Sequence, residues 1–168
     1  MDTMTTIDII PRIGGKLNIL ALDLATKTGW AFWHEVSGHE SGIVNFAPLK
    51  NDPGSRFTKL REWFKWIIQP DPEADLPDVI YYEDVHLRGK GSVVLAGLVC
   101  HMVEIASIYG IQCKPVHSGT LKKFATGNGK ATKKDMIHAA QRLGYFPKDD
   151  NEADALMLME YAKAKEGE

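Results

Sequence analysis

Three acidic residues stand where a carboxylate is costly or unexpected. Asp23 lies in the nearly continuous apolar run LNILALDL at 17–24, and Glu83 lies near the end of a second run, VIYYED, at 79–84. Asp154 follows in EADAL, at the start of the last helical pattern. A carboxylate in a buried strand is costly unless a partner compensates its charge. Because no arginine is an obvious partner, the combination suggests a cation between these acids.

The donor types indicate which cation to expect. These motifs contain no cysteine, and histidine occurs only outside them. Hard oxygen donors of this kind favour Mg²⁺, or Mn²⁺, over zinc. Two such ions can activate water and hold the leaving oxygen of a phosphodiester. The alternatives are a plain surface acid for Glu83, and helix capping for the acids at 149–154.

A basic segment accompanies the acids. Residues 114–134 include six lysines and no acid, although the net charge of the whole chain is −2. In KKFATGNGKATKK (122–134), backbone N–H groups and lysines could cradle a phosphate. This stretch is not a Walker A loop, because Phe124 and Ala131 occupy the positions of a required glycine and a required Ser or Thr. Alone it indicates a solvated turn, but an acidic site beside it favours binding of a DNA backbone.

A second glycine-rich basic stretch, HLRGKGS, follows Glu83 at 86–92. Its cations could reach phosphates, and His86 could stack or wedge at an opened base step. The alternative is a mobile surface loop. The residues that we expect to contact DNA are His86, Arg88, Lys90, Lys122, Lys123, Lys130, Lys133 and Lys134.

The hydrophobic pattern predicts the elements that position these residues. Three strands with short connections form an antiparallel meander, with Gly29 as a break after the first, and alternating helices and strands follow. This order predicts an α/β fold with one five-stranded mixed sheet flanked by helices. The predicted strands are 17–24, 30–35, 42–47, 79–84 and 111–116, and the predicted helices are 55–69, 92–109, 118–125, 131–143 and 152–164.

The organisation indicates one domain at 17–168, with a loosely ordered leader at 1–16. The helix at 92–109 is apolar nearly all round, so it is either deeply buried or shared with a partner. Neither a membrane span nor a signal peptide is expected, and two cysteines without metal-ligand spacing favour a reduced, cytoplasmic location. The aromatic residues assigned to packing alone are Trp30, Phe32, Trp33, Trp63, Phe64 and Trp66.

Four segments in order resemble the RuvC family of Holliday-junction resolvases, which have an RNase H-like fold. They are ILALDLATKTGWA (19–31), YYEDVH (81–86), KPVHSGTLKKFATGNGKATKKDM (114–136) and NEADALML (151–158). Together they span about residues 17–165. The order and spacing make the resemblance stronger than any one motif does.

The resemblance implies an endodeoxyribonuclease that cuts branched DNA as a homodimer and leaves 5′-phosphate and 3′-hydroxyl ends. It implies Asp23, Glu83, Asp154 and Asn151 as ligands of two Mg²⁺ ions. Lys122 and Lys133 match the family's basic residues near the scissile phosphate. A phage-like short version of the family would act in the cytoplasm of a bacterium or an infected host.

This chain departs from the family pattern at three places. Asn151 stands where the family has Asp or His, so Asp150 or Glu152 could complete the metal site. Leu24 follows Asp23 where the family continues with Pro-Gly, and His86 replaces an aromatic residue at the junction-opening position. These departures are compatible with nuclease chemistry but leave strict preference for four-way junctions open.

Other functions are compatible with parts of this pattern. An actin-like ATPase shares such a sheet, and Lys27 and Gly29 after Asp23 are compatible with its phosphate loop, although those proteins are longer. A branched-DNA-binding protein without catalysis would explain Asn151. The sequence also does not distinguish DNA from RNA as the substrate.

Overall fold

One five-stranded mixed sheet forms the centre of the computed structural model, which describes residues 17–68, 76–84 and 92–168. The strand order is β3-β2-β1-β4-β5, in which β1 pairs antiparallel with β2 and parallel with β4. The predicted fold class is therefore confirmed. The strands are β1 (Asn18–Asp23), β2 (Lys27–His34), β3 (Gly38–Asn45), β4 (Val79–Glu83) and β5 (Gln112–Val116).

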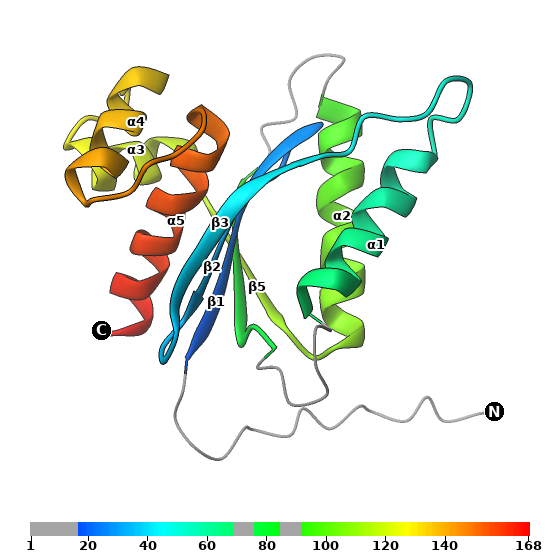
Figure 1. Ribbon diagram of the computed structural model, residues 1–168, viewed down its shortest axis with the longest axis horizontal. Helices are drawn as coiled ribbons and strands as arrows, with labels where there is room; N and C mark the ends of the chain where they lie inside the picture. Colours follow the sequence, from blue (N-terminus) through cyan, green and yellow to red (C-terminus); the bar gives the residue numbers. More distant parts are fainter. Residues whose placement is uncertain (1–16, 69–75, 85–91) are drawn as a thin grey trace.

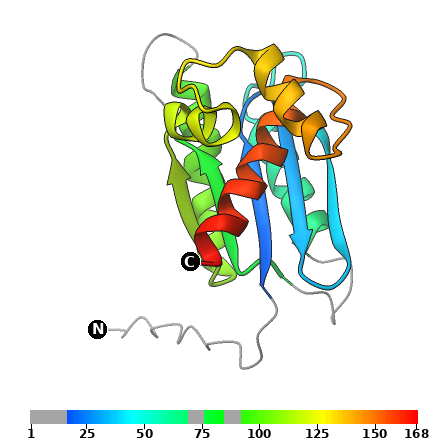
Figure 2. The same cartoon turned by 90° about the vertical axis from the view of Figure 1, so that its left-hand side faces the viewer.

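Helices cover both faces of the sheet. As Figure 1 shows, α1 and α2 lie on one face, and α5, with α3 and α4 beside its upper end, lies on the other. Figure 2 shows α5 running across the sheet. Among the described residues, no helix is both long and apolar enough to cross a membrane. The helices are α1 (Ser55–Ile68), α2 (Ser92–Ile108), α3 (Ser118–Thr126), α4 (Lys133–Arg142) and α5 (Asp150–Glu166).

The central strand β1 divides the core into two layers. Successive side chains of a strand point to opposite faces. Ile19 and Ala21 join the apolar cluster beneath α5, whereas Leu20 and Leu22 join the cluster beneath α1 and α2. This two-sided burial explains why the run at 17–24 is almost entirely apolar.

Two predicted features differ from the structure. Gly29, expected to break the chain, lies inside β2, which begins at Lys27. A glycine within a strand often marks a close approach of another backbone, as it does here. Trp66, expected to pack on the sheet, lies near the end of α1 and is 61% exposed, although its ring makes a T-shaped contact with Trp30 of β2.

Candidate active site

Asp23 and Glu83 end two neighbouring parallel strands. The register of Leu22 with Tyr82 places Asp23 beside Glu83 at the same end of the sheet. By strand alternation, Asp23 faces the same side as Ala21, and Glu83 faces the same side as Tyr81. Both carboxylates therefore lie on the face that α5 covers. Glu83, half-buried at the end of β4, therefore has a second acid beside it.

Gly29 brings α5 close to this pair. It is the partner of Asp23 on β2, and it packs directly against the backbone of Asn151 in the first turn of α5. A Cβ atom at this position would lie 1.9 Å from the Asn151 carbonyl oxygen. The missing side chain thus allows the first turn of α5 to approach the strand end that carries Asp23.

Asp154 lies on the face of α5 that meets the strand ends. Burial raises its pKa to about 7, and the negative charges of Glu83 and Asp150 contribute to the increase. Its Oδ1 is buried and has no hydrogen-bond partner among the described residues. A buried acceptor without a donor is costly, and a cation would relieve the cost.

Asp23 experiences the same crowding of negative charge. Burial raises its pKa well above the ordinary value, and Asp154, Glu83 and Asp150 raise it further. Lys133 acts in the opposite direction. The structure therefore brings together four carboxylates from two strands and one helix.

Two of the predicted lysines lie beside these acids. Lys133, the first residue of α4, forms an ion pair with Asp150 and lowers the pKa of both Asp23 and Asp154. Its own pKa is raised, chiefly by the hydrogen bond to Asp150. Lys122 on α3 also lowers the pKa of Asp154. Both lysines lie where a phosphate near the acids would be within their electrostatic reach.

The loop between α3 and α4 is a tightly bonded turn. Gly127 ends α3 with a positive φ of 80°, and the Thr132–Asp135 capping box begins α4. The N–H groups of Lys130 and Ala131 donate to the side chain and carbonyl of Asn128. Because these two N–H groups already donate within the loop, they are not available to bind a phosphate. The exposed lysines of this segment are the groups that could bind one.

The other predicted residues have different positions. Lys123, Lys130 and Lys134 are exposed on α3, the following loop and α4. Asn151 lies half-buried in the first turn of α5. His86, Arg88, Lys90 and the leader at 1–16 lie outside the described residues.

Glu152 does not belong to the acidic group, so the expectation that it could complete a metal site is not supported. It is 4% exposed, and its two carboxylate oxygens accept hydrogen bonds from the Ser41 hydroxyl and the Lys148 N–H, at 2.8 Å each. These bonds tie it to β3 and to the loop before α5. Asp150 is the acid of this turn that lies near Asp23 and Asp154.

The donor set suits a hard cation by its chemistry and charge. Asp23, Glu83, Asp150 and Asp154 supply only oxygen donors. The raised pKa values of Asp23 and Asp154, and the buried Asp154 Oδ1 without a hydrogen-bond partner among the described residues, indicate excess negative charge. Within the described ranges, however, no three acidic, histidine or cysteine side chains are grouped closely enough to hold an ion as they stand. The carboxylates would have to move closer together to share one.

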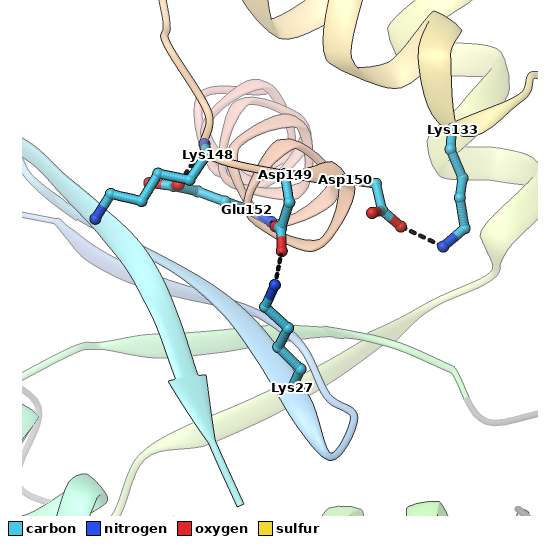
Figure 3. A network of polar contacts seen from close by, with 6 residues as sticks. All are labelled: Lys27, Lys133, Lys148, Asp149, Asp150 and Glu152. Atoms are coloured by element: carbon cyan, nitrogen blue, oxygen red, sulfur yellow. Dashed lines mark hydrogen bonds and ion pairs between the residues drawn. The ribbon is translucent and has the colours of Figure 1, made fainter.

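One contact at this site was not predicted from the sequence. Lys27, considered only as part of a phosphate loop, forms a 2.6 Å ion pair with Asp149, which caps the N-terminus of α5 (Figure 3). The capping alternative therefore describes Asp149. The acid-rich helix start was the available signal for the cap, but no local pattern connects it with Lys27.

Comparisons with known proteins support the architecture. No protein-family model and no curated protein matches the sequence. T. thermophilus RuvC in complex with a Holliday junction substrate has a TM-score of 0.70 at 16% identity, over 89% of this chain and 96% of that chain. A second Thermus thermophilus RuvC structure has a TM-score of 0.66 at 16% identity, with 89% and 97% covered.

The yeast mitochondrial Holliday junction resolvase Ydc2 has a TM-score of 0.59 at 11% identity, over 89% of this chain and 79% of that chain. All three likenesses extend over 89% of this chain. The chain therefore has the RNase H-like fold of the RuvC and Ydc2 resolvases.

Proposed function

We propose that this protein is a metal-dependent endodeoxyribonuclease that cuts Holliday junctions or other branched DNA. The observation that carries the proposal is the convergence of Asp23, Glu83 and Asp154 at one end of the sheet, with Lys122 and Lys133 beside them. Similarity in fold to two RuvC structures and Ydc2 supports the choice of substrate.

Asp23, Glu83 and Asp154 would hold two Mg²⁺ ions, or Mn²⁺, with Asp150 or Asn151 completing the set. When bound, such ions supply Lewis-acid activation of the attacking water and charge neutralisation at the departing 3′ oxygen. This hydrolysis leaves a 5′-phosphate and a 3′-hydroxyl. Because the pKa of Asp154 is about 7, protons compete with the cation for this carboxylate near neutral pH.

The lysines bind and orient the phosphate. Lys133 would exchange its bond to Asp150 for the scissile phosphate, and this exchange would release Asp150 toward the cation. Lys122 would offset negative charge that develops in the transition state. Exposed Lys123, Lys130 and Lys134 would bind more distant phosphates without reading sequence.

Paired cuts across a junction require two active sites, so the proposal includes a homodimer. Helix α2 exposes Val93, Val103 and Ile108 on the sheet face opposite α5, which supports it as the contact between copies. Light scattering should show a dimer that Ile108→Glu weakens. A monomer at working concentrations would contradict this part of the proposal.

Branched-DNA binding without catalysis is the second candidate, and Asn151 favours it. An amide at this position can donate a carbonyl oxygen to a cation but adds no negative charge. The test measures binding and cleavage of four labelled substrates, each with Mg²⁺ and with EDTA. The substrates are a four-way junction, a replication fork, linear duplex DNA and duplex RNA. Metal-dependent cuts confined to branched DNA support the nuclease, whereas tight junction binding without cuts supports the second candidate.

A further inference from the structure

We propose that Lys27 is a positioning residue, which holds the first turn of α5 at the distance from Asp23 that the acidic group requires. This inference rests on the proposed function and assigns a role to a residue outside the expected ligand and phosphate-binding sets. Figure 3 shows Lys27 reaching from the start of β2 to Asp149, the residue before α5.

An ion pair joins Lys27 to Asp149, the residue before α5. Lys27 Nζ lies 2.6 Å from Asp149 Oδ2, while Asp149 Oδ1 accepts the Glu152 N–H at 3.0 Å. Both carboxylate oxygens are therefore used, one toward the sheet and one toward the helix. Although burial raises the pKa of Asp149, its hydrogen bonds from Lys27 and Glu152 lower it below the ordinary value.

Strand pairing and hydrogen bonds hold the backbone on both sides of Lys27. Lys27 pairs with Asn45 in the β2–β3 register, and the Phe46 N–H donates to the Thr26 carbonyl at 2.7 Å. The buried Thr28 hydroxyl donates to the Ala25 carbonyl and accepts the Ala25 N–H. Hydrogen bonds therefore hold the short turn between Asp23 and Lys27. Because this turn is held, the ion pair fixes the start of α5 relative to the strand that carries Asp23.

Polar contacts from several elements hold the first turn of α5. Lys133 pairs with Asp150 from α4, and Ser41 bonds Glu152 from β3 (Figure 3 shows Lys133 and Glu152). Of these contacts, the Lys27 bond joins the helix start to the turn that follows Asp23. When DNA draws Lys133 away from Asp150, the Lys27 bond remains to hold the turn.

A plain surface ion pair is the competing explanation. The Lys27 side chain is 55% exposed, and exposed ion pairs contribute little to stability. On that explanation, removing the charge changes stability slightly and leaves cation affinity unchanged. A positioning role instead predicts a small stability change with a larger loss of cation affinity.

The test uses Lys27→Met, which keeps most of the side-chain length and removes the charge, with Lys27→Arg as the rescue. Lys114→Met is the matched control, because Lys114 pairs with Glu166 near the other end of the same helix. Mn²⁺ binding to the DNA-free protein is measured by electron paramagnetic resonance. The Mg²⁺ concentration for half-maximal cleavage and amide hydrogen exchange along α5 are measured beside it.

Lys27→Met should weaken Mn²⁺ binding and raise the Mg²⁺ requirement by about tenfold, with cleavage largely restored at saturating Mg²⁺. It should also speed exchange at Glu152, and Lys27→Arg should reverse these changes. Lys114→Met should leave both metal readouts unchanged. Unchanged Mn²⁺ binding in Lys27→Met, or an equal loss in Lys114→Met, would overturn the positioning role.

The failure of the proposed function gives a different result. If the unmodified protein neither binds Mn²⁺ nor cuts branched DNA, the nuclease proposal fails. Hydrogen exchange then still decides whether Lys27 holds the turn, and unchanged exchange at Glu152 in Lys27→Met would overturn the positioning role as well.

Discussion

Gly29 and Asn151 pack so closely that a Cβ on the glycine would lie 1.9 Å from the Asn151 carbonyl oxygen. This contact joins β2, next to Asp23, with the first turn of the helix that carries Asp154. The distance between the strand acids and the helix acids therefore depends on a residue that has no functional group of its own.

The variant Gly29→Ala tests this dependence. The added methyl group would push the backbone of α5 away, and overpacking of this kind costs about 1–3 kcal/mol. Displacing the helix acids should also reduce cleavage by about a hundredfold. Urea unfolding and single-turnover cleavage measure the two effects.

Gly54→Ala is the control for this prediction. A Cβ at Gly54 meets Asp52 Oδ1 at 3.5 Å, which is ordinary contact. Its cleavage should match that of the unmodified protein. Full activity in Gly29→Ala would mean that the position of α5 does not control the site.

The sheet and its two carboxylates could be predicted from the sequence because they depend on local patterns. The run at 17–24 indicated a strand buried on both faces, and β1 is such a strand. The alternation of side chains then fixes the face that Asp23 and Glu83 share. The fold class followed from the order of the elements.

The approach of α5 to the sheet could not be predicted, because it depends on contacts between distant segments. Gly29 indicated a chain break by its type alone, whereas its role is to admit the backbone of Asn151. Glu152 and Asp150 are equally acidic in sequence, yet Ser41 on β3 binds one and Lys133 on α4 binds the other. Only the packed structure separates their roles.

The pKa of Asp154 predicts how stability depends on pH without metal. Because the folded pKa is about 7 and the ordinary value is lower, the folded chain binds more protons than the unfolded chain. The free energy of unfolding should therefore fall by about 1–3 kcal/mol as the pH rises from about 4 to about 7. Asp23, whose pKa is also raised, acts in the same direction.

Urea unfolding in EDTA across this pH range checks the prediction. Asp154→Asn should flatten the pH dependence, and Mg²⁺ should restore stability to the unmodified protein above about pH 7 by binding the folded state. A free energy of unfolding that rises over this range in EDTA would contradict the proposed charge crowding.

The lysines around the acids should separate into two groups. Lys134→Ala removes an exposed charge from α4, so it should weaken junction binding uniformly and reduce the salt slope by about one. Lys133→Ala should reduce binding similarly but also slow cleavage at saturating DNA, since Lys133 lies beside Asp150. Fluorescence anisotropy in EDTA and single-turnover cleavage distinguish them. Equal cleavage rates in both variants would mean that Lys133 has no role in the cleavage step beyond DNA binding.

We propose that the acidic group around Asp23 performs metal-dependent cutting of branched DNA. The most direct measurement compares the unmodified protein with Asp23→Asn on a labelled four-way junction, with Mg²⁺ for cleavage and with EDTA for binding. The unmodified protein should cut only with Mg²⁺. The variant should bind the junction equally well but cut at least about a hundredfold more slowly. Cutting by Asp23→Asn at the normal rate would contradict the proposed active site.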